Sequence, residues 1–391
     1  MKKILLTGYY GQDNLGDDYI FYSLLDCLGE VQDFIELTVE VGNKYFDNAL
    51  YESLVQNYKN IKIKYLNTAS KTGKLRKLSK LTEVNYWIIG GGGLFASEDI
   101  SRMKHMNTYL RIARLNNVKI CMYGIDIDSL SKSGYINQWK KTIDLVDFIE
   151  TRNSTCASGL QKISDDSHKI IPGVDLTQGF YTKEEKELSK SDLLNKYGVR
   201  QKYMIWALAM PWSKQELMTA SINKRYKKLC SQFQHLLLHH KDIQHVFLPF
   251  FGGTDIDMIH DVIHNSGVNY IIIPQESSIG EKRYLFKFAS GAVVMRFHGV
   301  QFALFHSTPF IAVSYSPKTS NILKELKLSN RYVELGIRSN SCFMKEFDIP
   351  DASWKNLEDR LDLKNDDIRS ASDSLKMIAK DRQKYFIKWI E

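Results

Sequence analysis

Short apolar segments alternate with longer amphipathic ones along the first part of the chain. Each apolar segment has the length of a buried strand, and each amphipathic segment has the residue spacing of a helix. The predicted strands cover residues 3–7, 34–39, 61–66, 86–89, 119–123 and 148–151, and helices are predicted over 17–28, 102–115 and 134–146. This alternation favours a mostly parallel sheet that helices cover on both faces.

The same alternation begins again after a polar stretch rich in Lys and Glu, residues 182–195, which is typical of a domain connection. The second series predicts strands over residues 203–208, 246–249, 270–273, 292–295 and 310–313, a long helix over 214–241 and a charged helix over about 368–390. We therefore predict an α/β protein with two Rossmann-like domains that face a cleft. They cover residues 1–180 and 181–365, and residues 366–391 form an amphipathic helix that packs back on the domains.

Composition and charge narrow the class of protein. Of 391 residues, 43% are hydrophobic and 25% charged, the balance of a soluble globular chain. The five cysteines form no C-x-x-C pair, and residues 1–8 lack the apolar core of a signal peptide. We therefore expect a protein of the reducing cytoplasm, with no disulfide framework and no cysteine zinc site. The net charge of +8 suits an anionic substrate or an anionic membrane surface, whereas no signature of nucleic-acid binding is present.

Two glycine-rich turns each follow a predicted strand. In the first, Asn14 and Asp17 stand where the chain enters a helix, so they either cap that helix or bind sugar hydroxyl groups. The second is the run Gly90, Gly91, Gly92, Gly93. Such a run indicates that a ligand or another segment approaches the backbone closely, and its place at the carboxyl end of a strand favours a ligand.

Basic side chains follow three other strands. Arg152 comes after the strand at residues 148–151 and either points into the cleft or forms a surface ion pair. Arg296 and His298 follow the strand at 292–295, and Lys318 follows the next one. Because parallel strands end at one edge of a sheet, we expect Arg296, His298 and Lys318 to gather there. Arg and Lys can hold a phosphate or carboxylate, and His can transfer protons near neutral pH.

Together these segments resemble the polysaccharide pyruvyl transferase family over roughly residues 1 to 330. Two positions depart from the family pattern, since Asn153 and Cys156 stand where Asp and Ser are frequent. The matching elements are Asn14-Leu15-Gly16-Asp17, the Gly90–Gly93 run, Arg152, Arg296-Phe297-His298 and Tyr315-x-x-Lys318.

The resemblance implies a fold similar to GT-B glycosyltransferases. It also implies transfer of pyruvate from phosphoenolpyruvate (PEP) to a sugar of a surface-polysaccharide precursor, usually as a cyclic ketal. In the family the Arg-x-His motif is associated with PEP binding and proton transfer, which assigns those roles to Arg296 and His298. Arg152 and Lys318 are expected to help bind PEP. PEP is then the donor substrate, and neither a cofactor nor a metal ion is expected.

This assignment agrees with the chemistry of PEP. A small molecule that carries both a carboxylate and a phosphate needs several fixed cations to be held away from water. Our hypothesis is that Arg152, Arg296 and Lys318 supply them, and that His298 donates a proton to the methylene carbon. We place the sugar acceptor on the opposite wall of the cleft, at Asn14, Asp17 and the Gly90–Gly93 backbone.

Two other functions remain open at this point. A GT-B glycosyltransferase would use Arg296 and Lys318 on the diphosphate of a nucleotide sugar, and a non-catalytic protein of the same fold would only bind sugars.

A basic amphipathic segment suggests a further contact. Lys71, Lys74, Arg76, Lys77 and Lys80 interleave with leucines and could lie against anionic lipid at the inner face of the cytoplasmic membrane, which would suit a lipid-linked acceptor. A solvated helix on the first domain is the alternative. The histidines at positions 235, 239, 240, 260 and 264 are interpreted as solvated helix faces and not as metal ligands.

Overall fold

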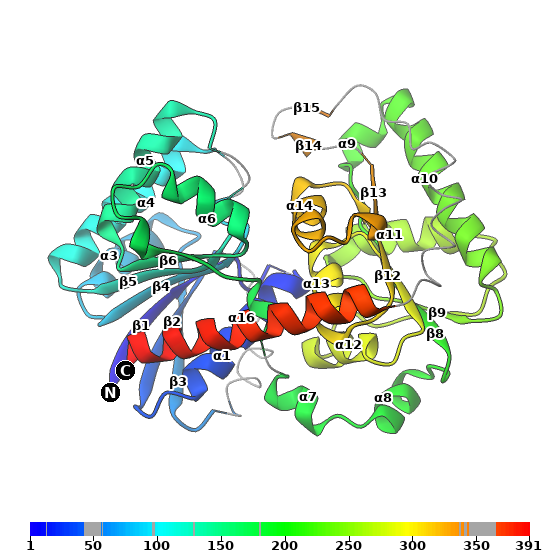
Figure 1. The fold of residues 1–391 in the computed structure, drawn as a ribbon, viewed down its shortest axis with the longest axis horizontal. Coiled ribbons are helices and arrows are strands. Elements are labelled where there is room, and N and C mark those ends of the chain that lie inside the picture. Colours follow the sequence, from blue (N-terminus) through cyan, green and yellow to red (C-terminus); the bar gives the residue numbers. More distant parts are fainter. Residues whose placement is uncertain are drawn as a thin grey trace. The chain divides into compact units, whose positions relative to one another are not determined.

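Two parallel sheets, one in each half of the chain, organise the protein, which confirms the predicted α/β class (Figure 1). The chain divides into two compact units, the first made of Met1–Lys183 with Leu375–Glu391 and the second of Glu184–Ser374. The computed structural model describes residues 1–12, 14–42, 56, 58–95, 98–127, 130–179, 181–335, 338–339, 342–343 and 365–391.

The sheet of the first unit has seven parallel strands in the order β3-β2-β1-β4-β5-β6-β7. The chain runs outward from β1 in one direction as far as β3 and then resumes on the other side of β1 with β4. Open α/β sheets bind ligands in a crevice at such a reversal, which in this sheet is expected beyond the carboxyl ends of β1 and β4. The strands are β1 (Lys2–Thr7), β2 (Ile35–Val41), β3 (Ile61–Asn67), β4 (Tyr86–Gly92), β5 (Lys119–Ile125), β6 (Phe148–Thr151) and β7 (Ile170–Pro172).

Helices cover both faces of this sheet, because successive strand residues point to opposite sides. Ile4 and Leu6 belong to the core shared with the first helix, whereas Leu5 belongs to the core on the other face. The helices of the unit are α1 (Leu15–Gly29), α3 (Lys71–Leu81), α4 (Ile100–Leu115), α5 (Ser133–Leu145) and α6 (Ser154–Gln161), with short 3₁₀ turns η1 (Ser167–Lys169) and η2 (Leu176–Gln178).

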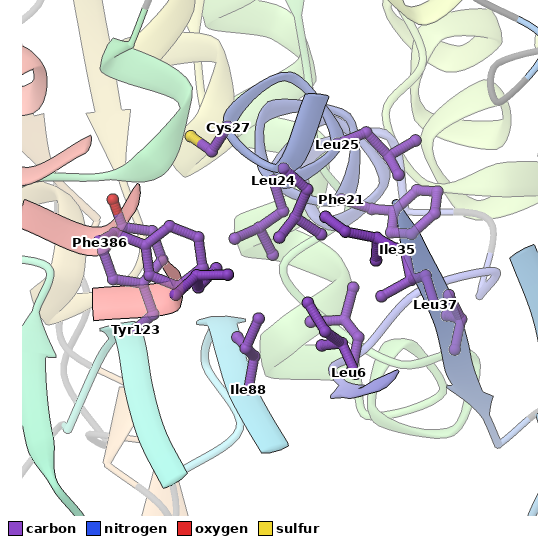
Figure 2. Close-up of a cluster of buried hydrophobic side chains, with 14 of the residues drawn as sticks. Leu6, Phe21, Leu24, Leu25, Cys27, Ile35, Leu37, Ile88, Tyr123 and Phe386 are labelled. Atoms are coloured by element: carbon purple, nitrogen blue, oxygen red, sulfur yellow. The ribbon is translucent and has the colours of Figure 1, made fainter. Parts of the chain in front are cut away.

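The end of the C-terminal helix α16 (Asp366–Ile390) completes the α1 face of the first sheet. Phe386 stacks on Tyr123 of β5 with 4.2 Å between the ring centroids, and Figure 2 shows the pair beside Leu24 of α1. The hydroxyl of Tyr86 donates to the Ile390 carbonyl at 2.7 Å. Aromatic stacking and this hydrogen bond hold the last turns of α16 against the strands of the first unit.

A buried carboxyl group lies on the same face. Glu150 of β6 is 1% exposed, and its Oε1 fills the space beside Gly173, where a Cβ would lie 2.5 Å away. Burial raises the pKa of Glu150 to about 8, although the positive charge of Arg382 on α16 opposes the shift. The folded protein therefore keeps this carboxyl protonated at neutral pH.

Replacing Glu150 with Gln is expected to flatten the pH dependence of stability. The unfolded chain releases the Glu150 proton near pH 4.5 and the folded one near pH 8, so wild-type stability falls as pH rises through that window. As the pH rises from about 5 to 9, the difference in the free energy of unfolding between Glu150→Gln and the wild type should shift by about 4 kcal/mol in favour of the variant. Urea unfolding across this range measures it. Glu83→Gln, at an exposed position, is the control, and parallel curves for wild type and Glu150→Gln would contradict the prediction.

The second unit repeats the architecture with six parallel strands in the order β10-β9-β8-β11-β12-β13. Here the chain order reverses between β8 and β11, which places the second crevice beyond the carboxyl ends of those two strands. The strands are β8 (Tyr203–Ala207), β9 (Gln244–Phe247), β10 (Tyr270–Ile272), β11 (Gly291–Val294), β12 (Phe310–Ser314) and β13 (Tyr332–Glu334), and β14 (Arg338–Ser339) pairs with β15 (Cys342–Phe343) in a separate antiparallel ladder.

Where one helix is predicted over residues 214–241, the structure has two: a capping box between Ser213 and Glu216 starts a single turn, the chain leaves the helix at Met218 and Thr219, and a second helix begins at Ala220. Arg331 is fully buried and pairs with Asp367 at the start of α16, at 2.9 Å. The helices of the unit are α7 (Lys183–Glu187), α8 (Lys190–Tyr197), α9 (Lys214–Leu217), α10 (Ala220–His239), α11 (Gly252–Ile263), α12 (Ile279–Phe286), α13 (Phe297–His306) and α14 (Pro317–Glu325), with the turn η3 (Ser329–Arg331).

Candidate functional site

At the crevice of the first unit, the turn after β1 delivers polar groups to the start of α1. Asn14 is the N-cap of this helix: its side-chain oxygen accepts from the Gly16 N–H at 3.3 Å, and its amide donates to the Asp17 carboxylate. Asp17 and Asp18 occupy the first helical turn, where the helix dipole favours negative charge. Asn14 and Asp17 thus do serve as cap and first-turn residues, and sugar binding by them stays a prediction.

The glycine run extends β4 and fits closely against the protein itself. Gly91 and Gly92 have φ angles of +73° and +79°, which other residues rarely adopt. A Cβ on Gly91 would lie 2.1 Å from Ile20, and one on Gly92 would lie 2.3 Å from Asp17 Oδ1. Tyr10 donates to the Gly90 carbonyl at 2.8 Å. The chain's own α1 and β1 turn therefore account for these glycines, and ligand contact by Gly90–Gly93 stays a prediction.

Arg152 lies in this first cluster. Its Nε is 3.0 Å from Asp175 and its Nη1 is 3.5 Å from Asp126, and all three side chains are at most 6% exposed. Burial by itself lowers the pKa of Arg152, but Asp175, Asp126 and Asp17 outweigh it and raise the pKa. The guanidinium is thus fully charged among three carboxylates, and the balance of the cluster is negative.

Cys156 supports this arrangement from the first turn of α6. Its thiol donates to Asp126 at 3.4 Å, and burial raises its pKa to about 12, so it stays protonated. A serine hydroxyl could make the same bond, which explains why Cys can stand at a position where the family pattern has Ser. Asp126 and Asp175 were not predicted. The sequence feature that could identify them is their position after a strand of the sheet: Asp126 follows β5 and Asp175 follows β7.

A second cluster forms at the crevice of the second unit, around Arg296, the N-cap of α13. Asp255 of α11 is fully buried, and Arg296 pairs with it through Nε at 3.1 Å and through Nη2. The backbone N–H groups of Phe250 and Phe251 also donate to Asp255, at 3.1 and 2.9 Å. Arg296 Nη1 lies 3.5 Å from the Tyr315 hydroxyl. The guanidinium is therefore held in one orientation, with 22% of its side chain still exposed.

Burial and the neighbouring groups together shift the pKa values of Asp255 and Arg296. Burial raises the pKa of Asp255, and the neighbouring Arg296 works against that shift. Burial by itself lowers the pKa of Arg296, but Tyr315 and Asp255 outweigh it and raise the pKa. Sequence reasoning did not place Asp255 in the site. The sequence feature that could identify Asp255 is its position shortly after β9, at the same edge of the sheet.

His298 and Lys318 stand in the first turns of neighbouring helices at this edge. α13 follows β11 and α14 follows β12, and the two strands are parallel and paired, with Ala292 opposite Phe310. His298 and Lys318 are both half-buried. The structure thus gathers Arg296, His298 and Lys318 at one sheet edge, together with two helix N-termini that favour anions.

Arg152 belongs to the other unit. The structure places it with Asp17 and Asp126, so its predicted role as a third cation beside Arg296 and Lys318 stays a prediction. Among the residues that the structure describes, no group of three or more His, Cys, Asp or Glu side chains could hold a metal ion.

The basic segment at α3 requires a correction. Lys77 belongs to the segment that could lie against lipid or be solvated, but it is 5% exposed, its Nζ lies 2.6 Å from Glu40, and it also lies over the Trp87 and Tyr109 rings. This ammonium neutralises a carboxylate inside the unit and cannot face a membrane.

Lys80 also forms ion pairs within the unit, with Glu36 at 3.5 Å and with Glu83 at 3.4 Å. Lys71, Lys74 and Arg76 stay exposed beside Leu75, which is 65% exposed. No helix in the described part of the chain is long and apolar enough to cross a membrane.

Comparison with known proteins gives a family and a fold. The family model described as polysaccharide pyruvyl transferase matches residues 14–317. No curated protein matches the chain.

Solved structures share the fold at low sequence identity. A UDP complex of Staphylococcus aureus MnaA has 14% identity and a TM-score of 0.62, over 100% of this chain and 96% of that one. Anabaena Alr3699/HepE with UDP and glucose has 12% identity and a TM-score of 0.56, over 99% of both chains. Phytolacca americana UGT2, complexed with UDP-2-fluoro-glucose and pterostilbene, has 9% identity and a TM-score of 0.58, over 100% of both chains.

Proposed function

Since the chain belongs to the polysaccharide pyruvyl transferase family, and is therefore a transferase, we propose that it moves pyruvate from PEP to a sugar of a surface-polysaccharide precursor. The proposed product is a cyclic ketal, and inorganic phosphate is released. One observation carries the proposal: Arg296 and His298 follow β11, Lys318 follows the paired strand β12, and Asp255 holds the Arg296 guanidinium.

The charges at this edge suit PEP. Asp255 uses one side of the Arg296 guanidinium, and the exposed part is left to receive a carboxylate or a phosphate. Lys318 and the N-termini of α13 and α14 add positive potential at this edge. Arg296 is proposed to orient PEP, and Lys318 to neutralise the remaining charge.

The proposed reaction begins with proton transfer. His298, protonated beside the bound anion, gives its proton to the methylene carbon of PEP, and the adjacent carbon becomes oxocarbenium-like. One sugar hydroxyl oxygen attacks that carbon, the carbon–oxygen bond to phosphate breaks, and a second hydroxyl closes the ketal. One of the two hydroxyl protons returns to His298 and the other leaves with phosphate or water, so no oxidant or cofactor is needed.

The first unit is proposed to hold the sugar acceptor. The half-buried Asn14, oriented by the buried Asp17, is proposed to bind sugar hydroxyls beyond β1 and β4, beside the Gly90–Gly93 backbone. The negative balance around Arg152 disfavours PEP there and suits a neutral acceptor. A helper role of Arg152 in PEP binding stays a prediction.

A GT-B glycosyltransferase that uses a nucleotide sugar is the second candidate, because the solved structures named above contain UDP or a UDP-sugar. Thermal shift separates the two functions: PEP should raise the melting temperature, and a panel of UDP- and GDP-sugars should not. Stabilisation by a nucleotide sugar alone would favour the second candidate. Phosphate release from PEP only when a sugar is present would exclude a protein that merely binds sugars.

We further propose that the protein works in the cytoplasm and contacts the inner face of the membrane through Lys71, Lys74, Leu75 and Arg76. Replacing Lys74 and Arg76 with Glu should lower the affinity for phosphatidylglycerol vesicles, measured by sedimentation, by about thirtyfold or more, since each cation near an anionic surface contributes about 1 kcal/mol. The control exchanges two exposed lysines on α5, Lys140 and Lys141, for Glu. Equal sedimentation with neutral and anionic vesicles removes the idea.

A further inference from the structure

The turn after β1 presents one aromatic side chain at the mouth of the first crevice. Tyr9 is 44% exposed, whereas the next residue, Tyr10, is 1% exposed. Other large exposed apolar side chains of this unit lie elsewhere. Phe34 precedes β2, and Leu115 ends α4 ahead of β5. Among the exposed large apolar residues of the first unit that the structure describes, only Tyr9 lies in a loop that directly follows a strand.

The shape of this turn is fixed on both sides of Tyr9. The Tyr10 ring occupies the space beside Gly8, where a Cβ would lie 2.1 Å from it, and its hydroxyl donates to Gly90 at 2.8 Å. The Gly11 N–H donates to Asp18 at 2.9 Å. Because Tyr10 already fills the inward space, Tyr9 cannot withdraw into the core. Its exposure therefore does not result from a loosely held loop.

We propose that Tyr9 is the stacking platform of the acceptor site and that its ligand is a neutral pyranose. An aromatic ring offers an apolar face to the C–H face of a sugar, while polar groups at the rim accept from the hydroxyls. Here the half-buried Asn14, the N-cap of the helix that follows the same turn, is such a group, and the buried Asp17 fixes the orientation of its amide. Three carboxylates against one guanidinium make the crevice negative, which disfavours uronic acids and phosphates.

The inference rests on the proposed function in one respect, namely that the first unit receives the acceptor. It can be tested without PEP and without turnover. Saturation-transfer NMR would use the full-length protein with methyl glycosides of glucose, galactose, mannose and N-acetylglucosamine as probes. At least one should receive saturation from the wild type. Tyr9→Ala should lower this transfer about fivefold to tenfold, and Tyr9→Phe should keep it.

The matched control is Phe34→Ala, which removes an aromatic ring with the same 44% exposure at the amino end of β2, whereas Tyr9 follows the carboxyl end of β1. It should leave the transfer unchanged. Equal signals from Tyr9→Ala and the wild type, or no transfer to any of the four glycosides, would overturn the platform. Equal transfer to methyl glucuronide would overturn its preference for neutral sugars. If the wild type contacts the glycosides but releases no phosphate from PEP in their presence, the result counts against pyruvyl transfer and not against the Tyr9 platform. Failure of the proposed function and failure of this inference are therefore distinguishable.

Discussion

Replacing His298 with Ala is expected to lower kcat by about 10²–10⁴, the usual contribution of a positioned general acid. His298 stands in the first turn of α13, two residues after the guanidinium that is proposed to hold PEP, and it is half-buried. Without the imidazole, no titratable side chain of the Arg-x-His motif can protonate the methylene carbon. Phosphate release at saturating PEP and acceptor measures the loss.

The His298 variant should still bind PEP, because Arg296 and Lys318 remain. Its thermal shift with PEP should therefore match that of the wild type, which separates lost chemistry from lost binding. His260→Ala, on the exposed face of α11, is the control and should keep full turnover. Turnover near the wild-type level in purified His298→Ala would remove the proton-transfer assignment.

Replacing Arg296 is expected to weaken PEP binding more than it slows the chemistry. Loss of a bidentate, charge-assisted contact should raise KM for PEP by about 10²-fold, with a smaller fall in kcat. Arg296→Lys should recover only part of the affinity, since an ammonium cannot reproduce the planar fork that Asp255 orients. Initial rates across a PEP titration at fixed acceptor measure both parameters.

The single Arg296→Ala variant has a predictable side effect, because it leaves Asp255 buried without its counterion. Removing one partner of a buried pair costs about 3–5 kcal/mol of stability. The paired variant Arg296→Met with Asp255→Asn removes both charges and should fold well while keeping the high KM. An unchanged KM for PEP in this folded pair would contradict the binding role of Arg296.

Much of the fold could be predicted because each strand is a short apolar segment between clear breaks. The three-residue strands β7 and β13 could not, since neither lies in a longer apolar run, whereas the equally short β10 lies in the apolar run of residues 270–273. Arg296, His298 and Lys318 could be predicted as neighbours because each directly follows a strand. The long helix predicted over residues 214–241 is interrupted at Met218 and Thr219, a break that the periodicity of apolar residues does not show.

The partners of the predicted residues were harder to find. Asp255 reaches Arg296 from a position 41 residues earlier, and Lys77 finds Glu40 across 37 residues. Helical spacing shows which residues share a face but not which carboxylate on another element neutralises them. For the same reason, the sequence does not show that Asp126 and Asp175 pair with Arg152, although each follows the end of a strand.

The central claim is that the protein transfers pyruvate from PEP to a sugar, and mass spectrometry of the products tests it most directly. Lipid-linked and synthetic glycosides are incubated with the purified protein and PEP, and in parallel with UDP-sugars. We expect a product that carries the added pyruvyl mass, formed with PEP and formed far more slowly when His298→Ala replaces the wild type. Glycosides that stay unchanged with PEP but gain a sugar residue from a UDP-sugar would contradict it.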